Sequence, residues 1–313
     1  MNLFYYFCHL IWQKYKSHNT MRKLRHIISS LLFLTVLPAM SQVLYKVEGN
    51  GLSSPSYIFG THHIAPLSTI DKFGAAGPFN EAQQVIGEID MTQDQMTLGL
   101  AMQPHMTAPA DSTLSKVISP EDFASINEEF KKWSIVPGAD LRMFDTMKPM
   151  VATAMVAVGM SAQAMPGFNP TEQLDTYFQT QGKFEGKTII PLETAEEQAT
   201  ILYDTTPISY QAEALVEMLK DPAEAIQAVK DLTDAYNAGD LAKMLELSEK
   251  QDEHPEFMKA LLDNRNANWL TKLPDLMKEA PSFIAVGALH LAGDNGIIEG
   301  LRKLGFTVTP VGN

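Results

Sequence analysis

The chain has 313 residues, of which 45% are hydrophobic and 19% are charged, so it is long enough to bury a large core without covalent cross-links. Its 24 basic residues stand against 37 acidic ones, which gives a formal net charge of −13 at pH 7. A surface this acidic repels phosphate backbones, so the composition argues against nucleic acid as a partner.

The first 41 residues have the pattern of a secretory leader. Met21 begins the positively charged stretch "MRKLRH", and an apolar run of 11 residues and the small-residue segment "PAMSQ" follow. This pattern is typical of a signal peptide, here cleaved before Gln42, and we take Met21 as the start of translation. The apolar run is too short to cross a bilayer as a helix, which takes about 20 residues.

Cleavage of this leader leaves an exported chain with 19 basic and 37 acidic residues, a net charge of −18, and no predicted membrane span. Cys8, the only cysteine, lies in the leader. The mature chain therefore has neither a disulfide nor a thiol nucleophile. Export without disulfides is compatible with a periplasm or with the cell exterior.

The mature chain opens with a predicted β-hairpin. The segments "VLYKVEG" and "PSYIFG" flank a turn-rich stretch, and the second strand ends at Gly60. A short helix over residues 71–84 leads to "QVIGEID", which predicts a buried strand. Residues 91–112 are rich in Met, Gln and Pro, and they predict a loop or short helices.

Helices with recognisable ends follow. Ser119 is the expected N-cap of "SPEDF", and "MVATAMVAVGMSAQAM" is apolar all round, as in a buried helix or an interaction surface. The next helix is expected between Asn169 as cap and Gly182 as stop. The strand "KTIIPLE" then leads into a helix that begins with a capping box made by Thr194 and Glu197.

The last part of the chain predicts a helical region and then strands again. Residues 207–279 predict several helices, and "SFIAVG", "NGIIEGLRKLG" and "FTVTPV" predict a strand, a helix and a strand. We therefore expect an α/β fold in one domain over residues 42–313. Strand motifs stand at both ends of this domain, and a large helical insertion lies between them.

Two segments share a Gly-x-x-His pattern. In "YIFGTHHIA" and in "FIAVGALHLAG" an apolar run is followed by a glycine, two further residues and a histidine, namely His63 and His290. The mature chain has five histidines, and three of them lie in these two segments. A glycine at this place lets the chain turn sharply out of a sheet and lets the backbone approach a ligand closely.

Carboxylates follow two other predicted strands. Glu88 lies near the end of "VIGEID", with Asp90 expected on the same strand face, and Glu193 ends "TIIPLE". Ligands of open α/β sheets bind beyond the carboxyl ends of the strands, so parallel neighbours would bring these groups together. Two histidines and a carboxylate suit a divalent transition metal, which lowers the pKa of a bound water from ~15.7 to ~7.

The ordered motifs "GTHH", "EID", "LETAEEQ", "LLDNRNANW" and "GALHL" resemble those of the TraB/GumN family, which includes the Tiki metalloproteases. The similarity spans about residues 43–313. It implies a mixed central sheet flanked by helices. The Tiki branch further implies metal-dependent peptide hydrolysis, with Mn or Co as the favoured ion and Zn as a second choice.

The resemblance also assigns residues. It makes His63 and His290 the metal-binding histidines, Glu88 the acidic residue of the second strand motif, and Arg265 and Asn266 the Arg-Asn pair of the family.

Each candidate also has a purely structural interpretation. His63 and His290 could be hydrogen-bonded core histidines, and Glu88 could pair with Arg265 instead of binding a metal. Glu193 could be an acid at a helix N-terminus, favoured by the helix dipole, and Arg265 could be a solvated helix residue. Three other histidines are not assigned to the site. His62 fills a place that is often apolar in the family, so its role stays open, and His105 and His254 lie in surface-like contexts.

We therefore expect an exported metal-dependent hydrolase that acts on a peptide or protein substrate. His63 and His290 would bind the metal, Glu88 would be a third ligand or the general base, and Glu193 would join the catalytic group. Arg265 would stabilise the developing oxyanion. Two alternatives stay open: an esterase-like hydrolase in which histidine and glutamate activate water without a metal, and a protein that binds a metal or cofactor without turnover.

Overall fold

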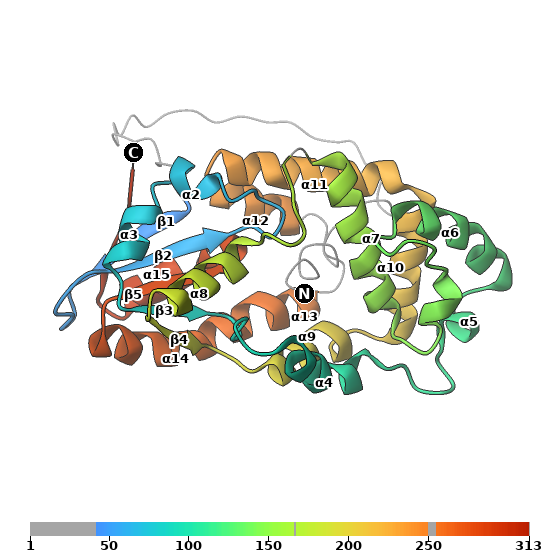
Figure 1. Ribbon diagram of the computed structural model, residues 1–313, viewed down its shortest axis with the longest axis horizontal. Coiled ribbons are helices and arrows are strands. Elements are labelled where there is room, and N and C mark those ends of the chain that lie inside the picture. Colours follow the sequence, from blue (N-terminus) through green and yellow to red (C-terminus); the bar gives the residue numbers. More distant parts are fainter. Residues whose placement is uncertain (1–41, 166, 250–254, 313) are drawn as a thin grey trace, which may run out of the picture.

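The computed structural model describes residues 42–165, 167–249 and 255–312, so the predicted leader and His254 lie outside the described residues. A six-stranded sheet with the strand order β4-β3-β5-β2-β1-β6 occupies one end of the molecule (Figure 1). The strands are β1 (Leu44–Glu48), β2 (Ser56–Thr61), β3 (Gln84–Gly87), β4 (Thr188–Pro191), β5 (Ser282–Gly287) and β6 (Thr307–Pro310).

The sheet is mixed. β1 pairs antiparallel with β2 as the predicted hairpin, and β6 pairs antiparallel with β1. β2, β5, β3 and β4 are neighbours that all pair in the parallel sense. The carboxyl ends of these four strands therefore lie along one edge of the sheet, which is the arrangement that the candidate site requires.

Helices flank the sheet and build the rest of the molecule, so the expected α/β class is confirmed. Figure 1 shows α5, α6, α7 and α10 at the end of the molecule opposite the sheet. The helices are α2 (Thr69–Lys72), α3 (Ala76–Glu81), α4 (Gln95–Met106), α5 (Leu114–Val117), α6 (Pro120–Trp133), η2 (Leu141–Phe144), α7 (Pro149–Ala164), α8 (Leu174–Phe184), α9 (Ala195–Asp204), α10 (Ile208–Lys220), α11 (Pro222–Asn237), α12 (Leu241–Glu249), α13 (Pro255–Met258), η3 (Lys259–Asp263), α14 (Asn264–Glu279), η4 (Ala288–Leu291) and α15 (Ile297–Lys303).

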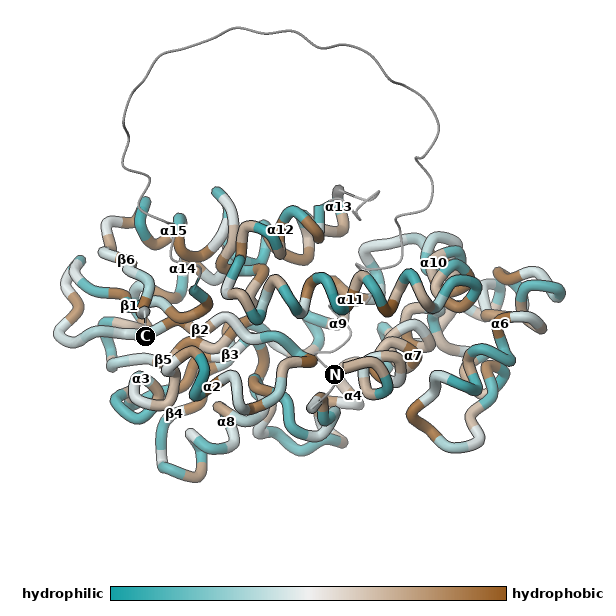
Figure 2. The backbone as a smooth tube through the Cα atoms, turned by 90° about the horizontal axis from the view of Figure 1, so that it is seen from above, coloured by the Kyte–Doolittle hydropathy of each residue, from teal (hydrophilic) through white to brown (hydrophobic). Residues whose placement is uncertain are grey.

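The helical insertion is split by β4, with α4 to α8 before this strand and α9 to α14 after it. Helix α7 is buried on most sides, as its uniformly apolar sequence predicts. By contrast, the tube of α11 alternates between teal and brown along its length, as an amphipathic helix should (Figure 2). None of the helices in the described residues is long and apolar enough to cross a membrane.

Several predicted helix ends are confirmed. Ser119 Oγ accepts a hydrogen bond from the Asp122 amide at the start of α6. Thr194 and Glu197 form the complete capping box of α9. In each case a side chain satisfies a backbone N–H that the first helical turn leaves without an intrahelical partner.

Other expectations were wrong in detail. Residues 95–106 form the regular helix α4, and the helix expected over residues 71–84 is two short helices, α2 and α3. Helix α8 begins at Leu174 rather than after Asn169, and Gly182 lies inside it. A Cβ at Gly182 would lie 2.7 Å from Val85 Cγ2, so this glycine lets the helix pack closely on β3 and does not end the helix.

The two Gly-x-x-His glycines have different roles. A Cβ on Gly60 would lie 3.0 Å from Ala288 Cα and 3.1 Å from its Cβ, so Gly60 allows β2 and η4 to approach each other closely. A Cβ on Gly287 would meet Glu88 and His290 only at ordinary contact distances of 3.4 and 3.5 Å. Gly287 has a φ of −51°, which any residue can adopt. The close approach at Gly60 is thus between two backbone segments.

This difference predicts unequal effects on stability. Gly60→Ala should lower the free energy of unfolding by about 1–3 kcal/mol, because the new methyl group meets backbone that has little room to move. Gly287→Ala is the matched control and should be neutral or stabilising by up to about 1 kcal/mol, since it restricts the unfolded chain. Urea unfolding followed by circular dichroism measures both. Equal losses in the two variants would contradict the packing role of Gly60.

Candidate functional site

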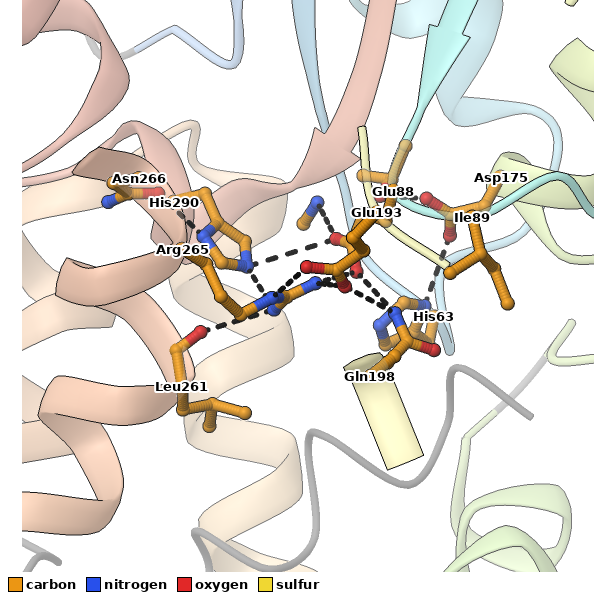
Figure 3. A network of polar contacts seen from close by, with 12 residues as sticks. His63, Glu88, Ile89, Asp175, Glu193, Gln198, Leu261, Arg265, Asn266 and His290 are labelled. Atoms are coloured by element: carbon orange, nitrogen blue, oxygen red, sulfur yellow. Dashed lines mark hydrogen bonds and ion pairs between the residues drawn. The ribbon is translucent and has the colours of Figure 1, made fainter. Parts of the chain in front are cut away.

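The candidate residues meet at the carboxyl edge of the parallel strands. In the register of the sheet Thr61 pairs with Gly287, and Gly87 pairs with both Ala285 and Pro191, so the four strands end close to the same level. The predicted histidines and carboxylates follow at once. Figure 3 shows them in one polar network, and a cavity of about 40 Å³ has three of them in its wall: His63, Glu88 and His290.

His290 is held in one tautomer by both of its ring nitrogens. Arg265 Nη1, which can only donate, lies 2.8 Å from His290 Nε2, so this nitrogen accepts. The proton is on Nδ1, which donates to Asn266 Oδ1 at 2.7 Å. The Asn266 amide is itself oriented, because its Nδ2 donates to the Asn295 carbonyl at 2.9 Å. The lone pair of His290 is therefore on Nε2.

His63 has an acidic partner that the sequence did not indicate. Its Nδ1 donates to Asp175 Oδ2 at 3.1 Å, and Thr61 Oγ1 donates to the other carboxylate oxygen at 2.7 Å. Asp175 lies on α8 and is only 2% exposed. Because Nδ1 carries the proton, Nε2 has the lone pair in the neutral ring of His63, as in His290. No local pattern separates Asp175 from an ordinary acid in the first turn of a helix.

Arg265 is the centre of the network, and the idea that it is a solvated helix residue was wrong. Its Nε donates to Glu193 Oε2 at 3.0 Å, and its Nη2 donates to Glu193 Oε1 at 2.5 Å and to Glu88 Oε2 at 2.8 Å. Its guanidinium carbon lies 4.5 Å from the ring centroid of Trp269. This residue thus joins the ends of β3 and β4 to α14.

Both glutamates lie in this polar network, and both are paired with Arg265. Glu88 Oε1 accepts the Gly287 amide at 2.9 Å, which fixes the carboxylate against the end of β5. Gln198, to which the sequence analysis gave no role, is fully buried, and its Nε2 donates to both carboxylates at 3.3 and 3.1 Å. Glu193 precedes the N-cap of α9, so its contacts are with this network rather than with the helix end.

The titratable groups of the network have pKa values shifted in different directions. Burial, the largest influence, raises the pKa of Glu88, but Arg265 and, to a smaller extent, His290 and His63 act in the opposite direction and together leave this pKa below its usual range. Burial raises the pKa of Glu193, and Arg265 does not offset the whole effect. Burial and the adjacent guanidinium lower the pKa of His290 to about 3. Near neutral pH, Glu88 is therefore ionised and His290 is neutral.

Two residues near the motifs, His62 and Asp90, have structural roles. His62 Nε2 donates to Thr233 Oγ1 at 3.1 Å, and burial holds the pKa of His62 well below its usual range. This buried contact holds α11 against the end of β2. Asp90 was expected beside Glu88, but β3 ends at Gly87, so the strand alternation does not continue. Asp90 instead accepts hydrogen bonds from the amide and hydroxyl of Thr92.

His105 was expected in a surface loop and lies in α4 instead. Its Nδ1 lies 2.6 Å from Asp204 Oδ2, and neither residue of this hydrogen bond belongs to the network around Arg265. It is therefore a suitable control residue for experiments on the site.

The residues present fit a divalent metal ion in their donor chemistry. Both motif histidines have an Nδ1 proton held by an oxygen acceptor, which is the orientation that metal-binding histidines use. Two buried carboxylates, Glu88 and Glu193, contact the guanidinium of Arg265, and a third, that of Asp175, contacts His63. Within the described residues, Gln198 Oε1 is a buried oxygen beside them without a hydrogen-bond partner. Oxygen atoms that could bind a cation therefore outnumber the cationic groups at this site.

The described arrangement is nevertheless not a preformed metal site. Among residues 42–165, 167–249 and 255–312, no three histidine, cysteine or acidic side chains are grouped closely enough to hold an ion. His290 Nε2 and Glu88 Oε1 are 3.9 Å apart, and Arg265 Nη1 lies on the lone pair of the histidine. A metal ion could bind to His290 only after Arg265 gave up this hydrogen bond.

The low pKa of His290 predicts a pH-dependent stability. His290 has a pKa of 6.5 in the unfolded chain and of about 3 in the folded chain. The stability that comes from keeping His290 neutral is therefore complete above pH 6.5 and is lost as the pH falls toward 3. In chelator-treated protein, His290→Gln should reduce the slope of unfolding free energy against pH by up to about 1.4 kcal/mol per pH unit between about pH 6 and 4. Urea unfolding at several pH values measures it.

The region above about pH 7 is the internal control, because His290 is neutral in both states there and the two slopes should agree. Parallel curves for wild type and variant throughout the acidic range would show that the folded protein does not keep His290 neutral.

Comparison with known proteins gives the context of this site. A sequence model of the TraB/PrgY/gumN family matches residues 43–310. The chain is 23% identical to the metalloprotease TIKI homolog of Nematostella vectensis, with 81% of this chain and 64% of that protein covered. It is also 23% identical to metalloprotease TIKI1 of Danio rerio, with 82% and 62% covered.

The chain thus spans less than two thirds of the length of either relative. No solved structure matches it. The family match includes every strand of the sheet and every residue of the polar network, which confirms the resemblance inferred from the ordered motifs. This chain belongs to the TraB/PrgY/gumN family.

Proposed function

We propose that the protein is an exported hydrolase that cleaves peptide bonds with the help of a divalent metal ion. The observation that carries the proposal is the meeting of two imidazoles and an ionised carboxylate, His63, His290 and Glu88, in the wall of one cavity. The names of the relatives from Nematostella vectensis and Danio rerio, both metalloproteases, support hydrolysis as the reaction. The signal-peptide pattern supports export.

The two histidines are the residues that would hold the metal. Asp175 and Asn266 each accept the Nδ1 proton of one ring, so the lone pair of each ring lies on Nε2. At His290 a metal ion would have to replace the hydrogen bond from Arg265. A divalent ion bound there would lower the pKa of a coordinated water from ~15.7 to ~7. The sequence resemblance favours Mn or Co over Zn, and the donor set of nitrogen and carboxylate oxygen is compatible with each of them.

Glu88 is the general base of the proposal. It is ionised near neutral pH, and the Gly287 amide and Arg265 hold its two oxygens in place. A carboxylate oxygen can accept more than one hydrogen bond, so Glu88 keeps the capacity to take a proton from water. Glu193 is a positioning residue, because it holds the guanidinium of Arg265 through two parallel hydrogen bonds.

Arg265 supplies the positive charge for the transition state. Its Nη1 donates to His290 Nε2, a neutral acceptor, and exchange of this contact for a developing oxyanion would give a stronger, charge-assisted bond. The apolar surroundings of the cavity raise the value of such a bond by excluding water.

A metal-independent hydrolase is the second candidate, and one observation favours it. Asp175 and His63 would form the acid–imidazole pair of general-base catalysis. The imidazole would take a proton from a water, and the carboxylate would stabilise the imidazolium that results. The chelation test below separates this candidate from the first. A protein that binds a metal without turnover would show the metal but no hydrolysis.

The proposed function predicts that activity depends on a bound metal ion. Cleavage of a fluorogenic peptide library should stop after treatment with EDTA and return with Mn²⁺ or Co²⁺. His63→Ala and His290→Ala should lose bound metal, measured by mass spectrometry of the metal content. Glu88→Gln should keep the metal but lower kcat by about 10²–10⁴-fold, because the proton acceptor is lost.

His105→Ala is the matched control, since this histidine has an acidic partner outside the network, and it should retain both metal and activity. Full activity in EDTA would reject the metal route, and loss of activity in His105→Ala to the same degree would show that the assay does not report on this site.

Asp175 should affect activity through the ring of His63. Asp175→Asn should weaken metal affinity and kcat/KM by about 10–100-fold, because a neutral amide replaces the charged acceptor that fixes the tautomer of the ring and raises the basicity of its Nε2. A loss of about 10⁴-fold without a change in metal affinity would favour the metal-independent route, in which the carboxylate stabilises an imidazolium. Asp90→Asn is the control, because Asp90 caps only the turn at Thr92.

A further inference from the structure

The two carboxylate oxygens of Glu88 have different surroundings. Glu88 Oε2 accepts hydrogen bonds from Arg265 Nη2 at 2.8 Å and from Gln198 Nε2 at 3.3 Å. Glu88 Oε1 accepts the Gly287 amide at 2.9 Å and lies 3.9 Å from His290 Nε2. Each oxygen of an ionised carboxylate can accept about two hydrogen bonds. The described residues therefore fill both positions on Oε2 and leave one position open on Oε1.

The cavity at the candidate site lies on the side of Glu88 Oε1. Its wall includes Gly287 and His290, which are the neighbours of this oxygen. Of the residues that the structure describes, neither Arg265 nor Gln198 belongs to the wall. Glu88 Oε1 therefore faces the space in which a water would react, and Glu88 Oε2 faces the network behind it.

Two donors bridge the same pair of carboxylate oxygens (Figure 3). Gln198 Nε2 lies 3.3 Å from Glu88 Oε2 and 3.1 Å from Glu193 Oε1. Arg265 Nη2 lies 2.8 Å and 2.5 Å from these two oxygens. Like charges repel, so the two carboxylates stay together only while donors join them. The terminal torsion of a glutamate is soft, so the loss of one bridging donor would let the carboxylate of Glu88 rotate.

The amide of Gln198 is oriented by its donor end. The side chain is fully buried, and the opposite orientation would place its carbonyl oxygen against two carboxylate oxygens, which also only accept. The carbonyl oxygen of Gln198 has no hydrogen-bond partner among the residues that the structure describes. A buried acceptor without a partner costs stability. Such a cost is typical of a residue that serves function rather than stability.

From this geometry we propose that Glu88 Oε1 is the oxygen that takes the proton of the attacking water, and that Gln198 is a positioning residue that keeps this oxygen toward the cavity by holding Glu88 Oε2. An O–H bond of the water breaks, its proton passes to Glu88 Oε1, and the electron pair stays on the oxygen that attacks the peptide carbonyl carbon. The inference rests on the proposed function for the reaction. It adds the reacting atom and a residue outside the cavity that controls it.

A double-mutant cycle tests whether Gln198 acts through Glu88. Gln198→Met keeps the length of the side chain and removes the donor, so kcat for peptide cleavage with Mn²⁺ should fall by about 10–100-fold. KM should stay the same, because Gln198 does not line the cavity. When Glu88→Gln is already present, Gln198→Met should change kcat by less than about two-fold, since the carboxylate that it positions is gone. Equal losses in both backgrounds, or no loss in the wild-type background, would overturn the inference.

Two further variants complete the cycle. Gln211→Met is the matched control, because Gln211 is also a fully buried helical glutamine, but its Nε2 donates to the carbonyls of Tyr203 and Thr206 outside the network. It should lower the unfolding midpoint and leave kcat unchanged. Gln198→Asn provides the test if Gln198→Met fails to fold. Its amide is one methylene shorter and cannot bridge both carboxylates, so the same loss of kcat is expected.

A measurement without turnover separates this inference from the proposed reaction. A high-resolution crystal structure of the protein should show a water at about 2.5–3.0 Å from Glu88 Oε1 and none on Glu88 Oε2, and Gln198→Met should show the carboxylate rotated. That result in a protein that hydrolyses no peptide supports the positioning of Glu88 by Gln198 and rejects the hydrolase. Hydrolysis together with an unmoved Glu88 carboxylate in Gln198→Met overturns the inference and leaves the hydrolase standing.

Discussion

The site depends on the burial of one guanidinium among two carboxylates and an imidazole. Arg265 is 3% exposed, and it donates to Glu193, Glu88 and His290, which follow three different strands. Burial of so many polar groups costs a large desolvation energy, which is recovered only when every donor has a partner. Removal of one member would leave a buried charge without compensation. The network therefore fixes the ends of β4, β3 and β5 relative to one another.

This constraint explains why the two motif histidines have the same tautomer although their partners differ. Asn266 is next to Arg265 on α14, so the helix that supplies the cation also supplies the acceptor for His290. His63 receives its acceptor, Asp175, from α8 on the other side of the sheet edge. Each ring is thus oriented by a helix that packs outside the sheet. The strands bring the rings together, and the helices decide which nitrogen has the lone pair.

The sequence predicted the parts of the site that follow from strand ends. Apolar runs that end in Gly60 and Gly287 placed the histidines, and the rule that ligands bind beyond parallel strands placed Glu88 beside them. Asp175 and Gln198 were missed because their contacts join residues 112 and 110 positions apart, and no helical pattern marks either one. The sequence likewise could not show that Gly182 is a packing contact, because a glycine near a helix end has the same appearance in either role.

The hydrogen bond between Arg265 Nη1 and His290 Nε2 is the contact that the proposed metal-dependent reaction would have to change. A metal ion needs the lone pair that this bond uses, and an oxyanion needs the donor. Since Arg265 keeps its hydrogen bonds to Glu193 and Glu88 through other nitrogens, the loss of this single bond need not expose the guanidinium. The low pKa of His290 ensures that a proton does not compete for the same lone pair at neutral pH. One exchangeable bond within an otherwise fixed network is therefore enough to connect the resting arrangement to a reactive one.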